Sequence, residues 1–290
     1  MGLLTAAIKK TATAPFHRVQ LQLQNQSANP CIRNGIVAKY DGMADCVARV
    51  YVEEGLLSFW RGALLSCLDF LPATMFDILF KPSIAYTLRK ALALVPGIYS
   101  NYPGQTNSMF AVLMRVGRDL ISYPRDCAEI RISLGMDDGK GTLKVLTDCY
   151  TSTFTSPGGL LRWCSCFVVS VASATLYRSA YLSIFRLANG ANPWKNDDHL
   201  IGLLSRFLAA QVTISLAAAM VYPFETVKNR LRMQVGGSHD ERFMYLGPVD
   251  WVKKIMREEG VLGFYGGFTV KPFGAMASSI VLVVCDQCIQ

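Results

Sequence analysis

The chain contains two copies of one pattern, YDGMADCVARVYVEEGLLSFWRG at residues 40–62 and YLGPVDWVKKIMREEGVLGFYGG at residues 245–267. At a constant offset of 205 positions (40 to 245), the identical residues include Tyr40, Gly42, Asp45, Glu53, Glu54, Gly55, Leu57, Phe59 and Gly62. A weaker middle copy lies at about half that offset, where Asp148, Cys149 and Gly158 correspond to Asp45, Cys46 and Gly55. Such self-similarity is the signature of a fold built from repeats.

A proline marker precedes each copy. It reads Ala14-Pro15-Phe16-His17 in the first repeat, Tyr123-Pro124-Arg125-Asp126 in the second and Tyr222-Pro223-Phe224-Glu225 in the third. The markers predict one domain of three repeats, at residues 1–105, 106–198 and 199–290.

Composition and hydropathy predict a membrane protein. Only 17% of the 290 residues are charged, whereas 51% are hydrophobic. Two apolar segments in each repeat predict six membrane-spanning helices, since about 20 residues suffice to cross a bilayer. These segments cover roughly residues 2–26, 63–88, 107–135, 161–188, 200–234 and 267–289. Pro15, Pro124 and Pro223 lie inside three of them and are expected to bend these helices, because proline removes a backbone donor.

The connections between the spans predict the orientation. The loops that follow spans one, three and five contain amphipathic stretches and most of the loop lysines and arginines. Basic loops stay on the inner side of a membrane, so these loops should face the matrix if the protein is mitochondrial. Both termini then face the intermembrane space. The net charge of +8 favours anionic lipid or an anionic solute as partner, and the scattered basic residues exclude a nucleic-acid site.

The prolines and their polar neighbours resemble the mitochondrial carrier family, most of all its ADP/ATP carriers. Further stretches that read like ADP/ATP carriers are Lys10-Thr11-Ala12-Thr13-Ala14-Pro15, Leu57-Ser58-Phe59-Trp60-Arg61-Gly62, Tyr177-Arg178-Ser179-Ala180-Tyr181 and Tyr222-Pro223-Phe224-Glu225-Thr226-Val227-Lys228. The likeness covers nearly the whole chain. It implies an all-α membrane fold of six tilted helices with three short amphipathic helices on the matrix side, in the inner mitochondrial membrane.

The resemblance implies alternating access, in which a ring of ion pairs closes the matrix side. The expected pairs here are His17 with Glu129, Asp126 with Lys228, and Glu225 with Gln20. The first pair is charge-reversed relative to the family, and the third leaves a hydrogen bond in place of an ion pair. A second interpretation is that these side chains are helix caps or polar groups between helices.

The second gate of the family, at the ends of the even-numbered helices, has lost its acid–base pattern in this chain. The positions hold Pro82 and Ala85, Arg186 and Asn189, and Asp286 and Ile289. The first helix is also short before Pro15. Both features argue against alternating access.

The substrate site implied by the resemblance is partly kept. Lys10 and Tyr177 match residues that hold phosphate and adenine, and Arg178 follows Tyr177. Asp69 and Gly274 stand where arginines are expected, and Lys271 is one turn from Gly274. Asp69 would repel a triphosphate. Arg115, Arg118 and Asp119 add charges to the third span, which makes them functional candidates, for transport or for contact with a partner.

Glycine-containing turns resemble the cardiolipin-binding turns of the family, because helix N-termini favour phosphate. The residues concerned are Tyr40, Gly42, Trp60, Arg61, Gly62, Tyr245 and Gly247. Bound cardiolipin is therefore expected, and no other cofactor. The nine cysteines form no pattern typical of a disulfide or metal framework.

Two functional classes remain open, and no set of residues resembles an enzyme's catalytic site. One is an antiporter for an adenine nucleotide or another small anion. The other is a non-transporting structural subunit of a larger inner-membrane assembly, such as a respiratory complex. The altered gates and substrate site favour the second class slightly.

Overall fold

The computed structural model describes residues 2–68, 70–93, 103–137, 139, 141–156, 158–191, 200–236 and 247–289. Within these ranges every regular element is a helix, as the all-α prediction requires. Two predicted site residues, Asp69 and Tyr245, lie outside the described residues.

Long helices account for all six predicted spans. They are α1 (Gly2–Asn25), α4 (Ala63–Leu68) with α5 (Phe70–Ala93), α7 (Pro103–Ser133), α9 (Gly159–Ala191), α10 (Leu200–Met233) and α12 (Val270–Ile289). Shorter helices and 3₁₀ turns connect them: η1 (Gln26–Ala28), α2 (Pro30–Arg33), α3 (Met43–Glu54), η2 (Leu56–Trp60), α8 (Thr142–Thr155), α11 (Pro248–Glu258) and η3 (Val261–Tyr265). The order long helix, surface helix, long helix thus occurs three times, although the repeat boundaries themselves stay a prediction.

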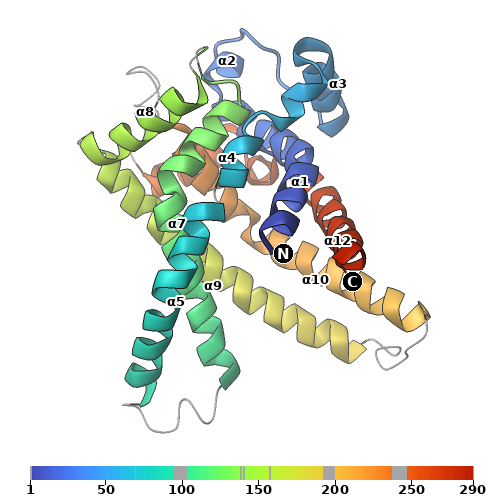
Figure 1. Cartoon of the computed structure of the whole chain (residues 1–290). Coiled ribbons are helices and arrows are strands. Elements are labelled where there is room, and N and C mark those ends of the chain that lie inside the picture. Colours follow the sequence, from blue (N-terminus) through green and yellow to red (C-terminus); the bar gives the residue numbers. More distant parts are fainter. Residues whose placement is uncertain are drawn as a thin grey trace.

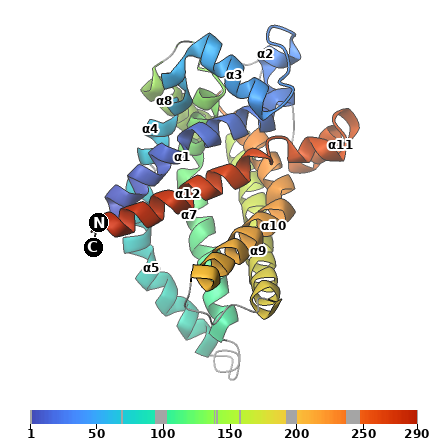
Figure 2. The ribbon, with the colours of Figure 1, turned by 90° about the vertical axis from the view of Figure 1, so that its right-hand side faces the viewer.

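The long helices form a closed ring. Each one contacts the next along the chain, and α12 contacts α1. The two chain ends consequently lie near each other in both views (Figures 1 and 2). The odd-numbered spans α1, α7 and α10 also contact one another. Their C-terminal halves converge where α2, α3 and α8 gather, at the top of both figures. We call this the surface-helix end.

The surface helices are amphipathic, and their apolar faces build the core at this end. In α3, Cys46 and Val50 are one turn apart and buried against α1 and η2. In α11, the fully buried Trp251 and Ile255 repeat this arrangement. Between the ends of α7 and α10, apolar side chains such as Ile132 and Met233 complete the core. This end is therefore the best-packed part of the protein.

Apolarity alone marks two of the described helices, Gly159–Gly190 and Ser205–Met233, as long and apolar enough to cross a membrane. Only 33% and 28% of their most apolar windows are buried inside the protein, so most of their apolar surface faces outward. Other long helices carry polar side chains, such as Lys10 of α1 and Asp126 of α7, that line an internal cavity. A helix of the ring needs an apolar surface only where it faces lipid.

The three marker prolines lie within continuous helices. Pro15 lies inside α1, Pro124 inside α7 and Pro223 inside α10, and α5 contains a further one, Pro82. His17 and Asp126, which follow the first two prolines, line the central cavity, whereas Glu225, which follows the third, lines a smaller cavity beside it.

Gly267, before α12, is required on two counts. Its φ is +75°, and a Cβ there would lie 2.8 Å from the backbone oxygen of Gln20. Gly260 has a similar φ of +69° with nothing within 4 Å of its Cβ position. We expect both alanine variants to lose about 1–3 kcal/mol because their backbone has a positive φ that glycine adopts more readily, and Gly267→Ala to lose about 1–3 kcal/mol more because of the overlap. Thermal unfolding of the two purified variants measures this difference, and equal midpoints would contradict the close approach.

Candidate functional site

A central cavity of about 550 Å³ lies inside the ring. Its floor is the convergence of α1, α7 and α10 near the surface-helix end. Its polar lining consists of Lys10, Thr13, His17 and Gln20 of α1, Ser66 of α4, Arg125, Asp126 and Glu129 of α7, Asn229 and Arg232 of α10, and Lys271 and Ser278 of α12. Residues from every repeat thus meet around one space.

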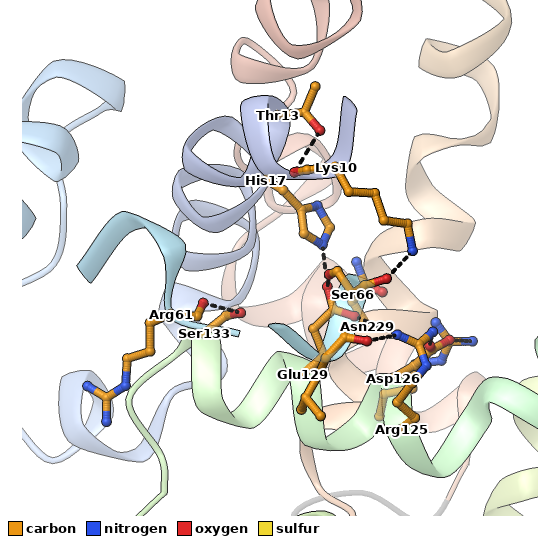
Figure 3. Close-up of polar contacts among 12 residues, drawn as sticks. Lys10, Thr13, His17, Arg61, Ser66, Arg125, Asp126, Glu129, Ser133 and Asn229 are labelled. Carbon is orange, nitrogen blue, oxygen red and sulfur yellow. Dashed lines mark hydrogen bonds and ion pairs between the residues drawn. The ribbon is translucent and has the colours of Figure 1, made fainter. Parts of the chain in front are cut away.

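The floor is centred on Glu129, whose side chain is only 11% exposed (Figure 3). His17 Nε2 lies 3.4 Å from Glu129 Oε1, which is the contact that the sequence predicts. Ser66 Oγ donates a hydrogen bond to the same carboxylate, and Arg125 Nη1 donates to Glu129 Oε2 at 3.1 Å. Lys10 Nζ donates to the backbone oxygen of Ser66. This cluster joins α1, α4 and α7.

The predicted pair of Asp126 and Lys228 is wrong in register. Asp126 Oδ2 instead lies 2.9 Å from Arg232 Nη2, and the Lys228 ammonium lies 3.6 Å from Asp119. Two ion pairs therefore connect α7 and α10 in parallel. Arg232 is one turn beyond Lys228 on the same face of α10, and its longer, planar side chain reaches the carboxylate from there.

The predicted contact of Glu225 with Gln20 is also wrong. Glu225 Oε2 accepts from Lys271 Nζ of the neighbouring helix α12, while Gln20 lines the central cavity. A carboxylate gains more from an ammonium than from an amide, which explains the choice of partner. Between α1 and α10 the described contacts are hydrogen bonds rather than ion pairs, and Arg230 Nη2 of α10 donates one of them to the Gln24 backbone oxygen at 3.2 Å. Gln24 Nε2 donates to Thr226 Oγ1, and Asn229 Nδ2 donates to Gln24 Oε1, both at 2.8 Å.

The candidate substrate residues are divided between two cavities. Lys10 and Lys271 line the central cavity. Tyr177 lines a smaller cavity of about 190 Å³, together with Arg115, Glu225 and Lys271. Arg178 is half-buried and lines neither of them. At Gly274, a Cβ would lie 3.5 Å from Phe16 Cβ, and the residue brings no base to the cavity.

The turns predicted to bind lipid have structural roles of their own. Trp60 Nε1 donates to the Thr11 oxygen at 3.0 Å, which ties η2 to α1. Arg61 Nη2 lies 2.6 Å from Asp137 Oδ1, so its charge is engaged across two repeats. Gly62, before α4, has a φ of +89°. Tyr40 stacks under Arg49, whose guanidinium carbon is 5.4 Å from the ring centroid.

The starts of α3 and α11 remain suited to an anion. Gly42 and Gly247 begin these helices, and neither helix has a side-chain cap on its first amides. In the first turn of α3, the backbone N–H of Asp41 and the Arg49 side chain lower the pKa of Asp45.

Two ion pairs of buried arginines with glutamates are not evident from the sequence patterns. Arg18 is 2% exposed and forms two hydrogen bonds to Glu54, at 2.7 and 2.9 Å. Arg230, also 2% exposed, binds Glu259 at 2.8 Å. The repeat itself points to the acids of these pairs, because Glu54 and Glu259 occupy equivalent positions in the two copies. The arginines do not occupy equivalent positions, which hid the pairs.

The thiol groups offer a test of accessibility and orientation. Burial raises the pKa of Cys46 to about 12, whereas Cys31 is exposed in α2 at the surface-helix end. We expect a membrane-impermeant maleimide to label a variant retaining only Cys31, from the side that the surface helices face. A variant retaining only Cys46 should react only after denaturation, because its thiol is buried and protonated. In intact mitoplasts, Cys31 labelled without opening the matrix would contradict the predicted orientation.

No metal centre emerges from the described part of the chain, where no group of three or more His, Cys, Asp or Glu side chains is placed to hold an ion.

Comparisons with known proteins point in one direction. The family model described as mitochondrial carrier protein matches residues 1–91 and 201–290, which contain the two strong copies of the repeat. The ADP,ATP carrier protein of Parachlorella kessleri is 32% identical over 295 residues, covering 99% of this chain and 82% of the relative. ADP/ATP translocase 3 of Homo sapiens is 32% identical over 292 residues, covering 99% and 94%. ADP/ATP translocase 2 of Tachyglossus aculeatus aculeatus is 34% identical over 294 residues, with the same coverage.

Proposed function

Because this chain belongs to the mitochondrial carrier family, we propose that it is an antiporter exchanging an adenine nucleotide or another small anion across the inner mitochondrial membrane. The observation that carries the proposal is the central cavity, which is enclosed by a ring of six spans and closed at the surface-helix end by polar contacts. The relatives, named as carriers and translocases, align over nearly the whole chain, which favours an adenine nucleotide.

The charge of the two cavities supports an anionic solute. Among their described lining residues, the bases are Lys10, Arg115, Arg125, Arg232 and Lys271, and the acids are Asp126, Glu129 and Glu225. Five bases against three acids leave a formal excess of two positive charges, with His17 neutral. Inside a membrane such an excess attracts anions strongly, because few water molecules screen it.

In this proposal the contacts at the cavity floor form the gate on the matrix side. His17 and Glu129 join α1 to α7, and Asp126 and Arg232 join α7 to α10. Hydrogen bonds through Gln24 join α10 to α1. Opening toward the matrix requires all three connections to break, and solute binding would offset that cost.

A bound cardiolipin is part of the proposal. The first backbone amides of α3 and α11 have no side-chain cap, so their N–H groups can donate hydrogen bonds to the phosphate oxygens of a lipid headgroup. Native mass spectrometry of the protein purified in mild detergent tests this. Loss of the adduct in a Gly42→Pro variant, with the helix content unchanged, would link the lipid to the start of α3.

The second candidate function, a non-transporting subunit of an inner-membrane assembly, rests on the outer gate. Pro82 and Ala85 of α5 cannot form an ion pair, and Arg186 and Asn189 of α9 offer no acid. The relatives support transport better than this candidate, since they are named as carriers or translocases of ADP and ATP.

Reconstitution distinguishes the two functions. Cardiolipin-containing liposomes with the purified protein are loaded with unlabelled ADP, and uptake of labelled ADP is measured. We expect exchange above that of protein-free vesicles, lost in Lys10→Ala and kept in Lys9→Ala, whose side chain does not line the two cavities. Folded protein that exchanges neither ADP nor other small anions, and that purifies at fixed stoichiometry within a larger complex, would instead support the structural subunit.

A further inference from the structure

The smaller cavity is a side pocket of the central one. Lys271 and Ala275 of α12 line both spaces, which places the two cavities side by side. Its remaining walls come from α7, α9 and α10, with Arg115, Tyr177, Ser215 and Glu225 as the polar groups. By resemblance alone, Tyr177 would hold a nucleobase here.

Arg115 changes the character of this pocket. Its guanidinium carbon lies over the Tyr177 ring, 5.7 Å from the centroid. Tyr181 stacks with the same ring at 6.2 Å, with an interplanar angle of 20°. A nucleobase that stacked on Tyr177 would have to compete with Arg115 for the ring face. The pocket therefore does not offer the open aromatic surface that base recognition needs.

The charge of Arg115 is also available to a ligand. The side chain is exposed, and no carboxylate among the described residues pairs with it. Glu225, the acid of the pocket, is bound by Lys271. Two bases against one acid leave one net positive charge in the pocket, carried by Arg115. An arginine at membrane depth without an acid needs water or an anionic ligand.

We propose that this pocket is an oxyanion site in which Arg115 binds a phosphate or carboxylate group of the transported solute in place of a nucleobase. This inference rests on the proposed antiporter function. It implies a solute with two anionic groups, one held by the bases of the central cavity and the other by Arg115. The guanidinium suits either oxyanion, because its fork matches two oxygens at once.

Ligand binding to the purified full-length protein in detergent tests the proposal. The probes are pyrophosphate, succinate, adenosine and ADP, measured by titration calorimetry. We expect pyrophosphate or succinate to bind, and Arg115→Gln to weaken that binding roughly 10- to 100-fold, as removal of a charged hydrogen bond does. Arg118→Gln is the matched control, since Arg118 lies one turn away, pairs with Asp77 and lines neither cavity. It should leave the affinity unchanged.

Tyr177→Leu separates the oxyanion site from a nucleobase site. If Arg115 binds an oxyanion, the ratio of ADP affinity to pyrophosphate affinity stays the same in this variant. If Tyr177 holds a base, that ratio falls to one in the variant. Adenosine, which has no phosphate, then also binds the unaltered protein. A fall in the ratio or the binding of adenosine overturns the proposal. A pyrophosphate affinity in Arg115→Gln within twofold of that of the unaltered protein also overturns it.

The liposome assay separates failure of this inference from failure of the proposed function. If Arg115→Gln does not change the exchange of ADP, the antiporter function is supported and the oxyanion site is contradicted. Folded protein that neither binds nor exchanges any of these anions removes both.

Discussion

Replacing Arg18 with alanine is expected to lower the free energy of unfolding by about 1.5–3 kcal/mol, the usual contribution of hydrogen bonds to a charged group, because its partner Glu54 is 34% exposed and keeps Arg61 at 3.6 Å. Arg18 is 2% exposed and contacts three elements. Besides its two bonds to Glu54 of α3, Nε donates to the Ser133 oxygen at the end of α7 at 3.1 Å, and Nη1 donates to the Ser58 oxygen of η2. An alanine would remove all of these bonds, although the Ser58 oxygen keeps the Arg61 N–H as a donor at 2.8 Å.

Arg49→Ala is the matched control for Arg18→Ala. Arg49 lies 2.7 Å from Asp45 in an i,i+4 pair on the outer face of α3, with both side chains partly in contact with solvent. Exposed pairs of this kind contribute little, so the control should unfold close to the unaltered protein. Thermal unfolding of both variants in the same detergent gives the comparison. Similar losses in the two variants would mean that Arg18 does not join α1, α3 and α7 as the structure shows.

The corrected register between α7 and α10 leads to the second large effect. Asp126→Asn is expected to cost about 3–5 kcal/mol, because it leaves Arg232 buried without its carboxylate. The two side chains are 16% and 8% exposed. Asp119→Asn should cost less, since Asp119 is 27% exposed and lies farther from its partner, 3.6 Å from Lys228.

Double-mutant cycles identify the partners directly. The cycle of Asp126→Asn with Arg232→Gln should give a coupling free energy near the upper end of the ~0.5–3 kcal/mol range for residues in contact. The cycle of Asp126→Asn with Lys228→Gln should give a value near the lower end. Unfolding by denaturant, monitored by intrinsic fluorescence, supplies the four free energies of each cycle. A larger coupling with Lys228 would restore the pair expected from the sequence.

The contact of His17 with Glu129 could be anticipated, whereas the partner of Asp126 could not. No basic residue lies one turn from His17 on α1, and Asp126, one turn from Glu129 on α7, is paired with Arg232. Lys228 and Arg232 are four residues apart on one face of α10, about 6 Å along the helix axis at 1.5 Å per residue. A shift of α7 against α10 by one turn therefore exchanges one partner for the other.

The sequence pattern also fails to identify the partner of Glu225. Its expected partner, Gln20, belongs to α1, but Glu225 forms an ion pair with Lys271 of α12. The sequence predicts that Lys271 is a base of the cavity and that Glu225 is a gate residue. Nothing in their spacing shows that the two side chains are in contact. Contacts between helices that are distant in the chain depend on how the ring closes.

The sequence by itself determined the repeats, the helical class and the position of the marker prolines, because these follow from local spacing, apolar periodicity and backbone chemistry. Only the tertiary structure decided that Asp126 meets Arg232, that Lys271 neutralises Glu225, and that Arg115 covers the ring of Tyr177. Each of these contacts joins side chains of different helices. Their distance depends on the axial shift and rotation of whole helices, which the packing of the entire ring sets.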